Sequence, residues 1–205
     1  MNSLKKFILY LFASSSLFLI SIYLPLFFFV YFPAWHLNQL QENKRIPIIG
    51  EKKAKEAVSE LYRFFRHEND LTLTEWSEKE KRHLREVRGI FDLLALLFFL
   101  SLLFLIGAKK RIPLEKICLW NGLVLLVLGI VLSVHFVFFW KNIFHPLLFK
   151  NDLWKNTPLD LSYYLMPRSF FKKISIMICC FSLIFQFSVC LLLKGRRHAH
   201  TKSIR

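Results

Sequence analysis

Four long apolar blocks divide the chain, and polar or amphipathic stretches separate them. The blocks cover residues of about 7–33, 89–108, 117–140 and 174–193. Each is close to the roughly 20 apolar residues that a helix needs to cross the hydrocarbon core of a membrane. The pattern therefore predicts an all-α integral membrane protein, with four transmembrane helices in a single domain over residues 1–205.

The first block is long for a cleaved secretory signal. Its uncharged run from Phe7 to Phe32 exceeds the roughly 7–15 apolar residues at the centre of a signal peptide, and no cysteine of lipobox type follows it. We expect this block to be a retained transmembrane helix and the chain itself not to be lipidated.

The first long polar segment, residues 34–88, contains two helical patterns. Within it, residues 51–67 place apolar side chains at helical spacing opposite Lys and Glu, which predicts an amphipathic helix that either lies on the outer leaflet or caps the bundle. From about residue 78 a helix is expected to run unbroken into the second apolar block. Two candidate capping boxes precede that helix, Thr72-x-x-Glu75 and Ser77-x-x-Glu80.

The second long segment, residues 141–173, combines prolines with many aromatic side chains. Its prolines interrupt any long helix, and Trp and Tyr are favoured in the headgroup layer of a membrane. We expect short interfacial or re-entrant helical structure here, with the aromatic residues forming a wall.

Charge predicts the orientation of the chain. The 29 Lys and Arg exceed the 14 Asp and Glu, giving a formal net charge of +15, and the excess lies before the first block, in residues 109–116 and in residues 194–205. The positive-inside rule then places both termini and the short basic loop in the cytoplasm, and residues 34–88 and 141–173 outside it. The same basic stretches favour contact with anionic membrane lipids over binding to nucleic acid.

His83 and His145 are the candidate catalytic residues. The even number of spans places both long segments on one side of the membrane, so both histidines are expected near the outer interface. Imidazole titrates near neutral pH, which suits an acid/base pair, although each histidine alone is also typical of an interfacial hydrogen-bonding residue. The histidine spacings match no H-x-x-x-H or H-x-x-E-H pattern, so no metal site is expected.

Four further residues have open interpretations. Arg88 and Asp92 are four residues apart and can form an ion pair on one helix face. Asp160 can cap a turn or orient a histidine, and Trp154 is more typical of an interface anchor than of a substrate platform.

Several classes of protein are disfavoured. The chain has no phosphate-binding G-x-x-x-x-G-K-[ST] loop, no G-x-S-x-G elbow and no dinucleotide fingerprint, and its four cysteines all lie in apolar helices. An enzyme of this sequence would need no nucleotide and would use histidine-assisted proton transfer on a membrane-borne substrate. The alternatives are a non-catalytic membrane adaptor and a small transporter subunit; the nearly featureless second and fourth blocks count against the transporter.

Three motifs follow one another in a characteristic order: H-L-x-x-V-R, F-H-x-L-x-F-x-x-x-x-W and P-x-D-x-x-x-x-x-x-P-x-x-F-F. With the number of helices and the loop sizes, this ordered set resembles the lipoprotein intramolecular transacylases (Lit), four-helix integral membrane proteins. The matching residues are His83, Leu84, Val87 and Arg88, then Phe144, His145, Leu147, Phe149 and Trp154, then Pro158, Asp160, Pro167, Phe170 and Phe171.

The resemblance implies an enzyme of the bacterial cytoplasmic membrane that acts on diacylated lipoproteins. It would move the sn-2 acyl chain of a diacylglyceryl-cysteine to the α-amino group of the same cysteine, giving the lyso-form, and would need no cofactor. His145 is then expected to be the base and His83 the proton donor. Supporting or substrate-binding roles are expected for Arg88, Trp154, Asp160, Phe144 and Pro167.

Overall fold

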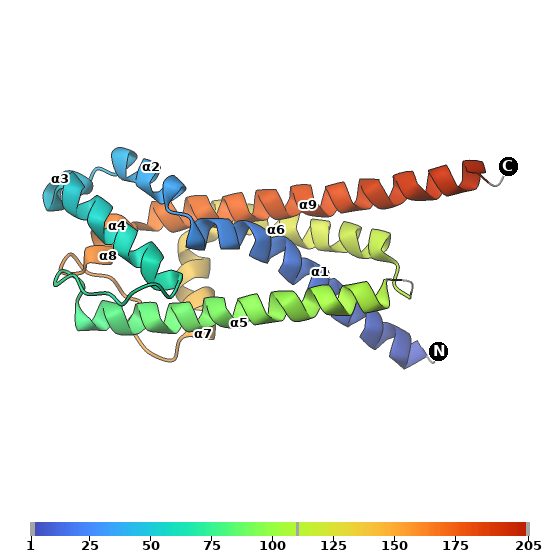
Figure 1. Ribbon diagram of the computed structural model, residues 1–205, viewed down its shortest axis with the longest axis horizontal. Helices are drawn as coiled ribbons and strands as arrows, with labels where there is room; N and C mark the ends of the chain where they lie inside the picture. Colours follow the sequence, from blue (N-terminus) through green and yellow to red (C-terminus); the bar gives the residue numbers. More distant parts are fainter. Residues whose placement is uncertain (1–2, 110, 204–205) are drawn as a thin grey trace. The chain divides into compact units, whose positions relative to one another are not determined.

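The computed structural model describes residues 3–109 and 111–203, with side chains described up to residue 195 (Figure 1). Lys110 of the basic loop, and residues 204–205 of the basic tail, lie outside the described residues. The described part is helical and contains no strand. Its elements are α1 (Ser3–Tyr31), α2 (Ala34–Glu42), α3 (Ile46–Ile49), α4 (Glu51–Phe65), α5 (Glu78–Ala108), α6 (Leu114–Phe139), the π-helix η1 (Trp140–Phe144), α7 (His145–Leu148), α8 (Leu161–Leu165) and α9 (Arg168–Ser203).

Four of these helices, α1, α5, α6 and α9, are long and apolar enough to span a membrane. The prediction of an all-α protein with four membrane-spanning helices is therefore confirmed. The helices extend beyond the apolar blocks, because backbone hydrogen bonding continues through polar turns that the hydrophobic pattern does not include. The chain divides into two compact units, and the division falls inside each of the four long helices.

The first unit consists of Met1–Pro25, Leu93–Val131 and Ile176–Arg205. Polar side chains connect its helices within an otherwise apolar environment. The Ser14 hydroxyl donates to Asn121 Oδ1 at 2.7 Å, and the Ser182 hydroxyl donates to the Ser21 carbonyl at 2.7 Å. Such interhelical hydrogen bonds stabilise helix association in membranes, where burial of apolar surface gives no driving force.

The second unit, Leu26–Asp92 and Leu132–Ser175, groups α2, α3, α4 and α8 around a core to which α4 contributes most (Figure 1). The apolar face of α4 is buried, with Val58 fully covered and Leu61 and Phe64 at most 2% exposed. Of the two interpretations of residues 51–67, the structure supports packing against protein. A helix lying on the outer leaflet would have left this face in contact with lipid.

The start of α5 confirms one of the two candidate capping boxes. Glu80 Oε2 accepts hydrogen bonds from the Ser77 backbone N–H at 3.0 Å and from the Ser77 hydroxyl at 2.9 Å. Thr72 does not cap a helix and instead donates to the Glu60 carboxylate through its N–H and its hydroxyl. Burial raises the pKa of Glu60, but its hydrogen bonds with Thr72, Leu73 and Trp76 outweigh that effect and hold the pKa below its usual value.

Side chains in the first turn of α5 also bind the second long segment, residues 141–173. Glu80 Oε1 accepts hydrogen bonds from the Ser162 N–H at 2.7 Å and the Ser162 hydroxyl at 2.5 Å. Beside it, the Lys79 ammonium forms a 2.6 Å ion pair with Asp160. The Glu80 side chain is buried and accepts four hydrogen bonds, so it stabilises the contact between α5 and α8 without leaving a buried carboxylate oxygen unsatisfied.

The buried side chain of His36 in this unit predicts a pH-dependent stability. Its side chain is 1% exposed and its Nε2–H donates to the Leu165 carbonyl at 3.2 Å. Burial lowers the pKa of His36 from 6.5 to about 4, against a smaller opposing effect of the Leu165 hydrogen bond. Between these two pH values the unfolded chain binds a proton on this ring and the folded chain does not.

We therefore expect the free energy of unfolding to fall as the pH is lowered from 6.5 to 4, by about 3 kcal/mol from His36 alone. Thermal unfolding of the purified protein in detergent at pH 7 and pH 5 measures this loss. His36→Asn should start from a lower stability and lose less on acidification. An equal loss in both proteins would contradict the assignment.

Candidate active site

His83 lies in the second turn of α5, directly beyond the capped start of the helix. Its side chain is 16% exposed, and its Nδ1 lies 3.6 Å from Glu86 Oε2, one turn further along. The other oxygen of Glu86 accepts a hydrogen bond from Asn151 Nδ2 at 2.8 Å. Glu86 therefore connects His83 to the segment that follows α7.

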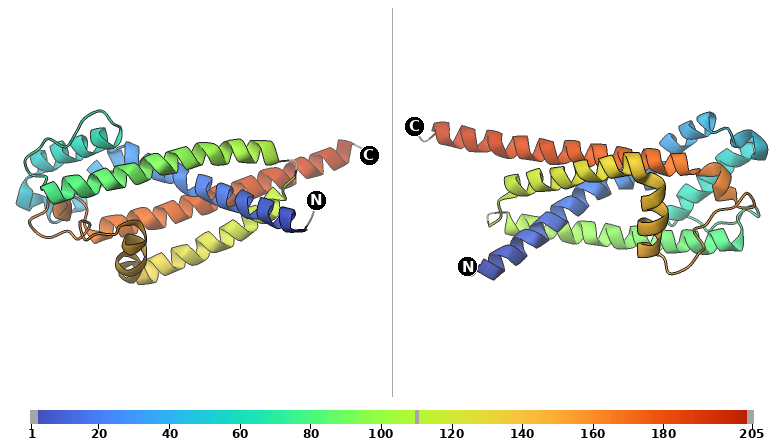
Figure 2. Two further views of the ribbon diagram at one scale, coloured as in Figure 1. Left: turned by 90° about the horizontal axis from the view of Figure 1, so that it is seen from below. Right: turned by 180° about the vertical axis from the view of Figure 1, so that it is seen from behind.

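A π-turn positions His145. The backbone of α6 is non-helical at His135, and after Phe139 the chain continues through η1 directly into α7 (Figure 2). In a π-turn each N–H binds the carbonyl five residues earlier, and here the N–H of His145 binds the carbonyl of Trp140. Single π-turns occur frequently at functional sites.

The imidazole of His145 binds the same carbonyl, with 2.8 Å between its Nδ1 and the Trp140 oxygen. A carbonyl oxygen only accepts hydrogen bonds, so Nδ1 is the nitrogen that carries the proton. In the neutral ring, Nε2 then has the free lone pair. This is the tautomer that accepts a proton at Nε2.

Aromatic side chains surround His145. The Trp154 ring stacks on the imidazole with the ring centres 4.3 Å apart, and the Trp140 ring packs against it edge-on at 4.5 Å. Trp140 in turn stacks on Phe144 and on Phe171, each at 4.8 Å. The imidazole is fixed on several sides, which restricts the orientation of its ring.

The two histidines contact one phenyl ring. Phe149, itself buried, lies with its ring centre 4.7 Å from that of His83 and 5.7 Å from that of His145. Residues that are 62 positions apart in the sequence therefore meet around Phe149, one from α5 and one from the start of α7. Phe144 and Trp154 also belong to this cluster.

Asp160 lies away from both imidazoles. Its carboxylate accepts hydrogen bonds from the Thr157 N–H at 2.7 Å and the Thr157 hydroxyl at 2.9 Å, in addition to its ion pair with Lys79. Burial raises the pKa of Asp160, but the hydrogen bonds with Lys79 and Thr157 outweigh it and lower the pKa overall. Asp160 closes a turn, which is one of its two expected roles, and its described partners include no histidine.

Arg88 does not pair with Asp92, the acid four residues later, but contacts Phe64 of α4. Its guanidinium lies 4.0 Å from the centre of the Phe64 ring and donates to the Phe64 carbonyl at 3.3 Å. Asp92 pairs instead with His67, with 2.9 Å between Nε2 and Oδ1. The expected Arg88–Asp92 ion pair is wrong, because the end of α4 offers each side chain a partner that the sequence spacing does not indicate.

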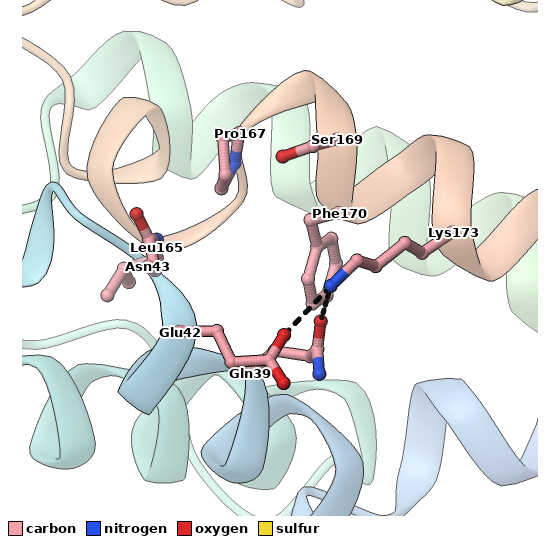
Figure 3. A pocket seen from close by; sticks show the side chains of 8 residues that line it. All are labelled: Gln39, Glu42, Asn43, Leu165, Pro167, Ser169, Phe170 and Lys173. Atoms are coloured by element: carbon pink, nitrogen blue, oxygen red, sulfur yellow. Dashed lines mark hydrogen bonds and ion pairs between the residues drawn. The ribbon is translucent and has the colours of Figure 1, made fainter.

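Pro167 does not belong to the cluster around Phe149. It lines a cavity of about 50 Å³ between α2 and the start of α9 (Figure 3). Lys173 reaches across this cavity and donates to Gln39 Oε1 at 2.7 Å and to Glu42 Oε2 at 2.9 Å. Neither His83 nor His145 lines it. A volume of this size accommodates about one or two water molecules, so it is too small for an acyl chain.

The sequence interpretation did not select Glu86, Trp140 or Phe149 as site residues. Glu86 has a local signal, since it follows His83 by three positions and so lies on the same helix face. Phe149 belongs to the second motif but had no assigned role. The part played by the Trp140 carbonyl has no sequence signal, because a π-turn does not alter the hydrophobic pattern.

Comparison with solved structures shows the same fold in three structures of one enzyme, two of which are of substituted variants. The membrane-integral lipoprotein intramolecular transacylase Lit from Bacillus cereus is 19% identical, with a TM-score of 0.77, and the match covers 100% of both chains. A variant of it with histidine replaced by alanine is 20% identical, with a TM-score of 0.72 over 95% of this chain and 96% of the other. A histidine-to-arginine variant is 21% identical, with a TM-score of 0.71 over 95% of each chain. No curated protein sequence matched the chain.

The family comparison extends over most of the sequence. The model of the family described as lipoprotein intramolecular transacylase Lit matches residues 7–171. This range includes α1 to α8, the start of α9 and the whole cluster around Phe149. The chain is a multi-pass membrane protein that belongs to the Lit family of lipoprotein transacylases.

Proposed function

We propose that this protein moves the sn-2 acyl chain of a diacylglyceryl-cysteine lipoprotein to the α-amino group of the same cysteine, by acid/base catalysis at His145 and His83. Membership of the Lit family supports transacylation of a lipoprotein. The arrangement of the two imidazoles around Phe149 supports the roles of the histidines.

Counted from the neutral amine, which forms when the ammonium releases a proton, the reaction moves one proton from nitrogen to oxygen. The amine nitrogen attacks the sn-2 ester carbonyl, and the carbonyl oxygen becomes an oxyanion in the tetrahedral intermediate. When the intermediate collapses, the bond from carbon to the glyceryl oxygen breaks, an amide forms, and the proton lost by nitrogen ends on the glyceryl hydroxyl. The acyl donor and acceptor belong to one substrate, so no cofactor is consumed.

His145 is the proposed base. An α-amino group has a pKa of about 7.7–8.0, so most of it is protonated at neutral pH and it must lose a proton to attack. The hydrogen bond from Nδ1 to the Trp140 carbonyl leaves Nε2 as the proton acceptor. This 2.8 Å bond is the observation that carries the proposal, because it fixes both the tautomer and the direction of the ring.

His83 is the proposed proton donor to the oxyanion or to the leaving glyceryl oxygen. Burial lowers the pKa of His83, which makes its imidazolium a stronger acid, and the carboxylate of Glu86, 3.6 Å from Nδ1, partly opposes this effect. Hydrogen bonding of Glu86 with Asn151 keeps that carboxylate in place. Each positioned proton transfer contributes roughly 10²–10⁴-fold to the rate.

Holding the amine and ester together on one substrate adds an effective-concentration gain. The aromatic side chains around His145 are proposed to hold the acyl chains and exclude water from the reacting groups. The basic residues at the start of α1, in residues 109–116 and in residues 194–205 favour cytoplasmic termini in the bacterial cytoplasmic membrane, which would place the histidines at the outer interface. The proposed partners are accordingly diacylated lipoproteins and the lipids around them.

The test is expression in a bacterial host that lacks N-acylation, followed by tandem mass spectrometry of the N-terminal peptide of a lipoprotein. An intramolecular transfer leaves the total mass of the lipopeptide unchanged but moves one acyl chain from the glyceryl fragment to the cysteine nitrogen. A peptide heavier by one acyl chain would indicate transfer from another lipid. A free α-amino group would favour the non-catalytic adaptor.

A further inference from the structure

A second cavity lies where α1 ends, and it is ten times larger than the cavity beside Pro167. Its volume is about 510 Å³, within the usual range for sites that bind small molecules. Phe27 and Tyr31 of α1 and the following Phe32 line it, together with Phe65 and residues 66–68 after α4. The exposed fractions of Phe27 and Phe32 are 44% and 48%, so the cavity is open along a membrane-spanning helix.

The cavity changes from apolar to charged along the axis of α1. Phe27 to Phe32 extends over about 7 Å of helix rise and forms the aromatic part. Arg66, His67 and Glu68 form the rim, close to the end of the span, and Asp92 is bound to His67. An amphiphile with a chain in the membrane and a polar head at the interface has the same gradient.

Arg66 is held in place and retains hydrogen-bonding capacity. Its Nε and Nη2 donate to the two carboxylate oxygens of Glu68 at 2.6 and 3.0 Å, and its Nη1 donates to the Tyr31 carbonyl at 3.1 Å. These bonds use three of the five N–H donors of a guanidinium. The other two are suited to the oxygens of a phosphate.

His67 occupies a backbone position where glycine is the usual residue. The N–H of Glu68 binds the Arg63 carbonyl at 2.9 Å and the N–H of His67 binds the Phe64 carbonyl at 3.1 Å, which is the Schellman ending of a helix. His67 has the left-handed φ of 61° that this ending requires. The chain therefore carries an imidazole at a position that disfavours a side chain, and this imidazole reaches Asp92 at the rim.

We propose that this cavity binds a membrane glycerophospholipid whose headgroup contains both a phosphate and a primary amine. The rim carries the guanidinium of Arg66 and the carboxylate of Glu68, and the carboxylate of Asp92 lies behind it, bonded to the rim residue His67. A phosphate complements the guanidinium and an ammonium complements the carboxylate of Glu68, whereas an anionic lipid without an amine would complement the guanidinium alone. Asp92 follows His83 by nine residues, about 180° around α5, so this site lies on the face of α5 opposite the catalytic histidine.

The test is native mass spectrometry of the full-length protein released from detergent micelles that contain one lipid at a time. Phosphatidylethanolamine, phosphatidylcholine and phosphatidylglycerol with identical acyl chains are the probes. We expect phosphatidylethanolamine to be retained about tenfold more than either of the others, the scale of one hydrogen bond to a charged group. Equal retention of the three lipids would mean ordinary boundary lipid and would overturn the proposal.

Two variants separate headgroup recognition from loss of folding. Glu68→Gln removes a carboxylate but leaves the guanidinium, so the preference should move toward phosphatidylglycerol, a reversal that misfolding cannot produce. Arg66→Gln should lower the retention of both phosphatidylethanolamine and phosphatidylglycerol. Arg82→Gln, an exposed arginine on α5 that does not line the cavity, is the matched control and should behave as the unmodified protein. An unchanged order of preference in Glu68→Gln would overturn the proposal.

Discussion

Replacing His145 with alanine is expected to lower the rate of lyso-form production by about 10²–10⁴-fold, the usual contribution of a positioned base. The substitution removes the nitrogen that would take the proton from the substrate amine, and leaves the Trp140 carbonyl without its side-chain donor. The measurement is the initial rate of conversion of a purified diacylated lipopeptide by the protein in mixed micelles, followed by tandem mass spectrometry.

A second substitution at the same position distinguishes the base from the packing. The amide of His145→Asn can still donate to the Trp140 carbonyl but cannot accept a proton at neutral pH, so its rate should be as low as that of the alanine variant. His135→Ala, at an exposed position in α6, is the control and should keep its activity. If His145→Asn retained a rate within about threefold of the unmodified protein, His145 would not be the base.

Replacing His83 with alanine is expected to lower the rate by a similar factor, about 10²–10⁴-fold, because the developing charge on the substrate oxygen loses its proton donor. Glu86→Gln should have a smaller effect, of about tenfold, because the imidazole remains and only its nearby negative charge is removed. Arg82→Ala, an exposed neighbour on α5, is the control. The same lipopeptide assay measures all three rates.

The double variant His83→Ala/His145→Ala tests whether the two histidines act on one substrate. Groups that act as a unit have strongly non-additive effects, so the double variant should be little slower than either single variant. A rate loss equal to the product of the two single losses would mean that the histidines act independently. Near-normal conversion by His83→Ala would remove it from the mechanism.

Much of the fold could be predicted because its signals are local. Apolar blocks of the right length indicated the four long helices, and the Ser77-x-x-Glu80 pattern marked the start of α5. That His83 and His145 lie on the same side of the membrane followed from the two spans that separate their segments. These predictions needed no knowledge of which side chains meet.

The remaining features depend on contacts between distant residues. An apolar face on α4 can pack against either lipid or protein. Only its burial in the structure distinguishes a helix on the membrane surface from a helix packed on the protein. Lys79 binds Asp160 across 81 positions, and Arg88 binds Phe64 on another helix in place of its nearby acid. The tautomer of His145 depends on a π-turn, whose extra residue leaves no trace in a helical pattern.

The bonds from Lys79 and Glu80 to Asp160 and Ser162 have a consequence for the design of hybrid enzymes. A transplanted stretch covering residues 149–162 loses the ammonium donor of Lys79 and the buried carboxylate acceptor of Glu80 unless the opening turn of α5 is transplanted with it. Substrate-range engineering by exchange between homologues should treat these two distant pieces of chain as a single cassette.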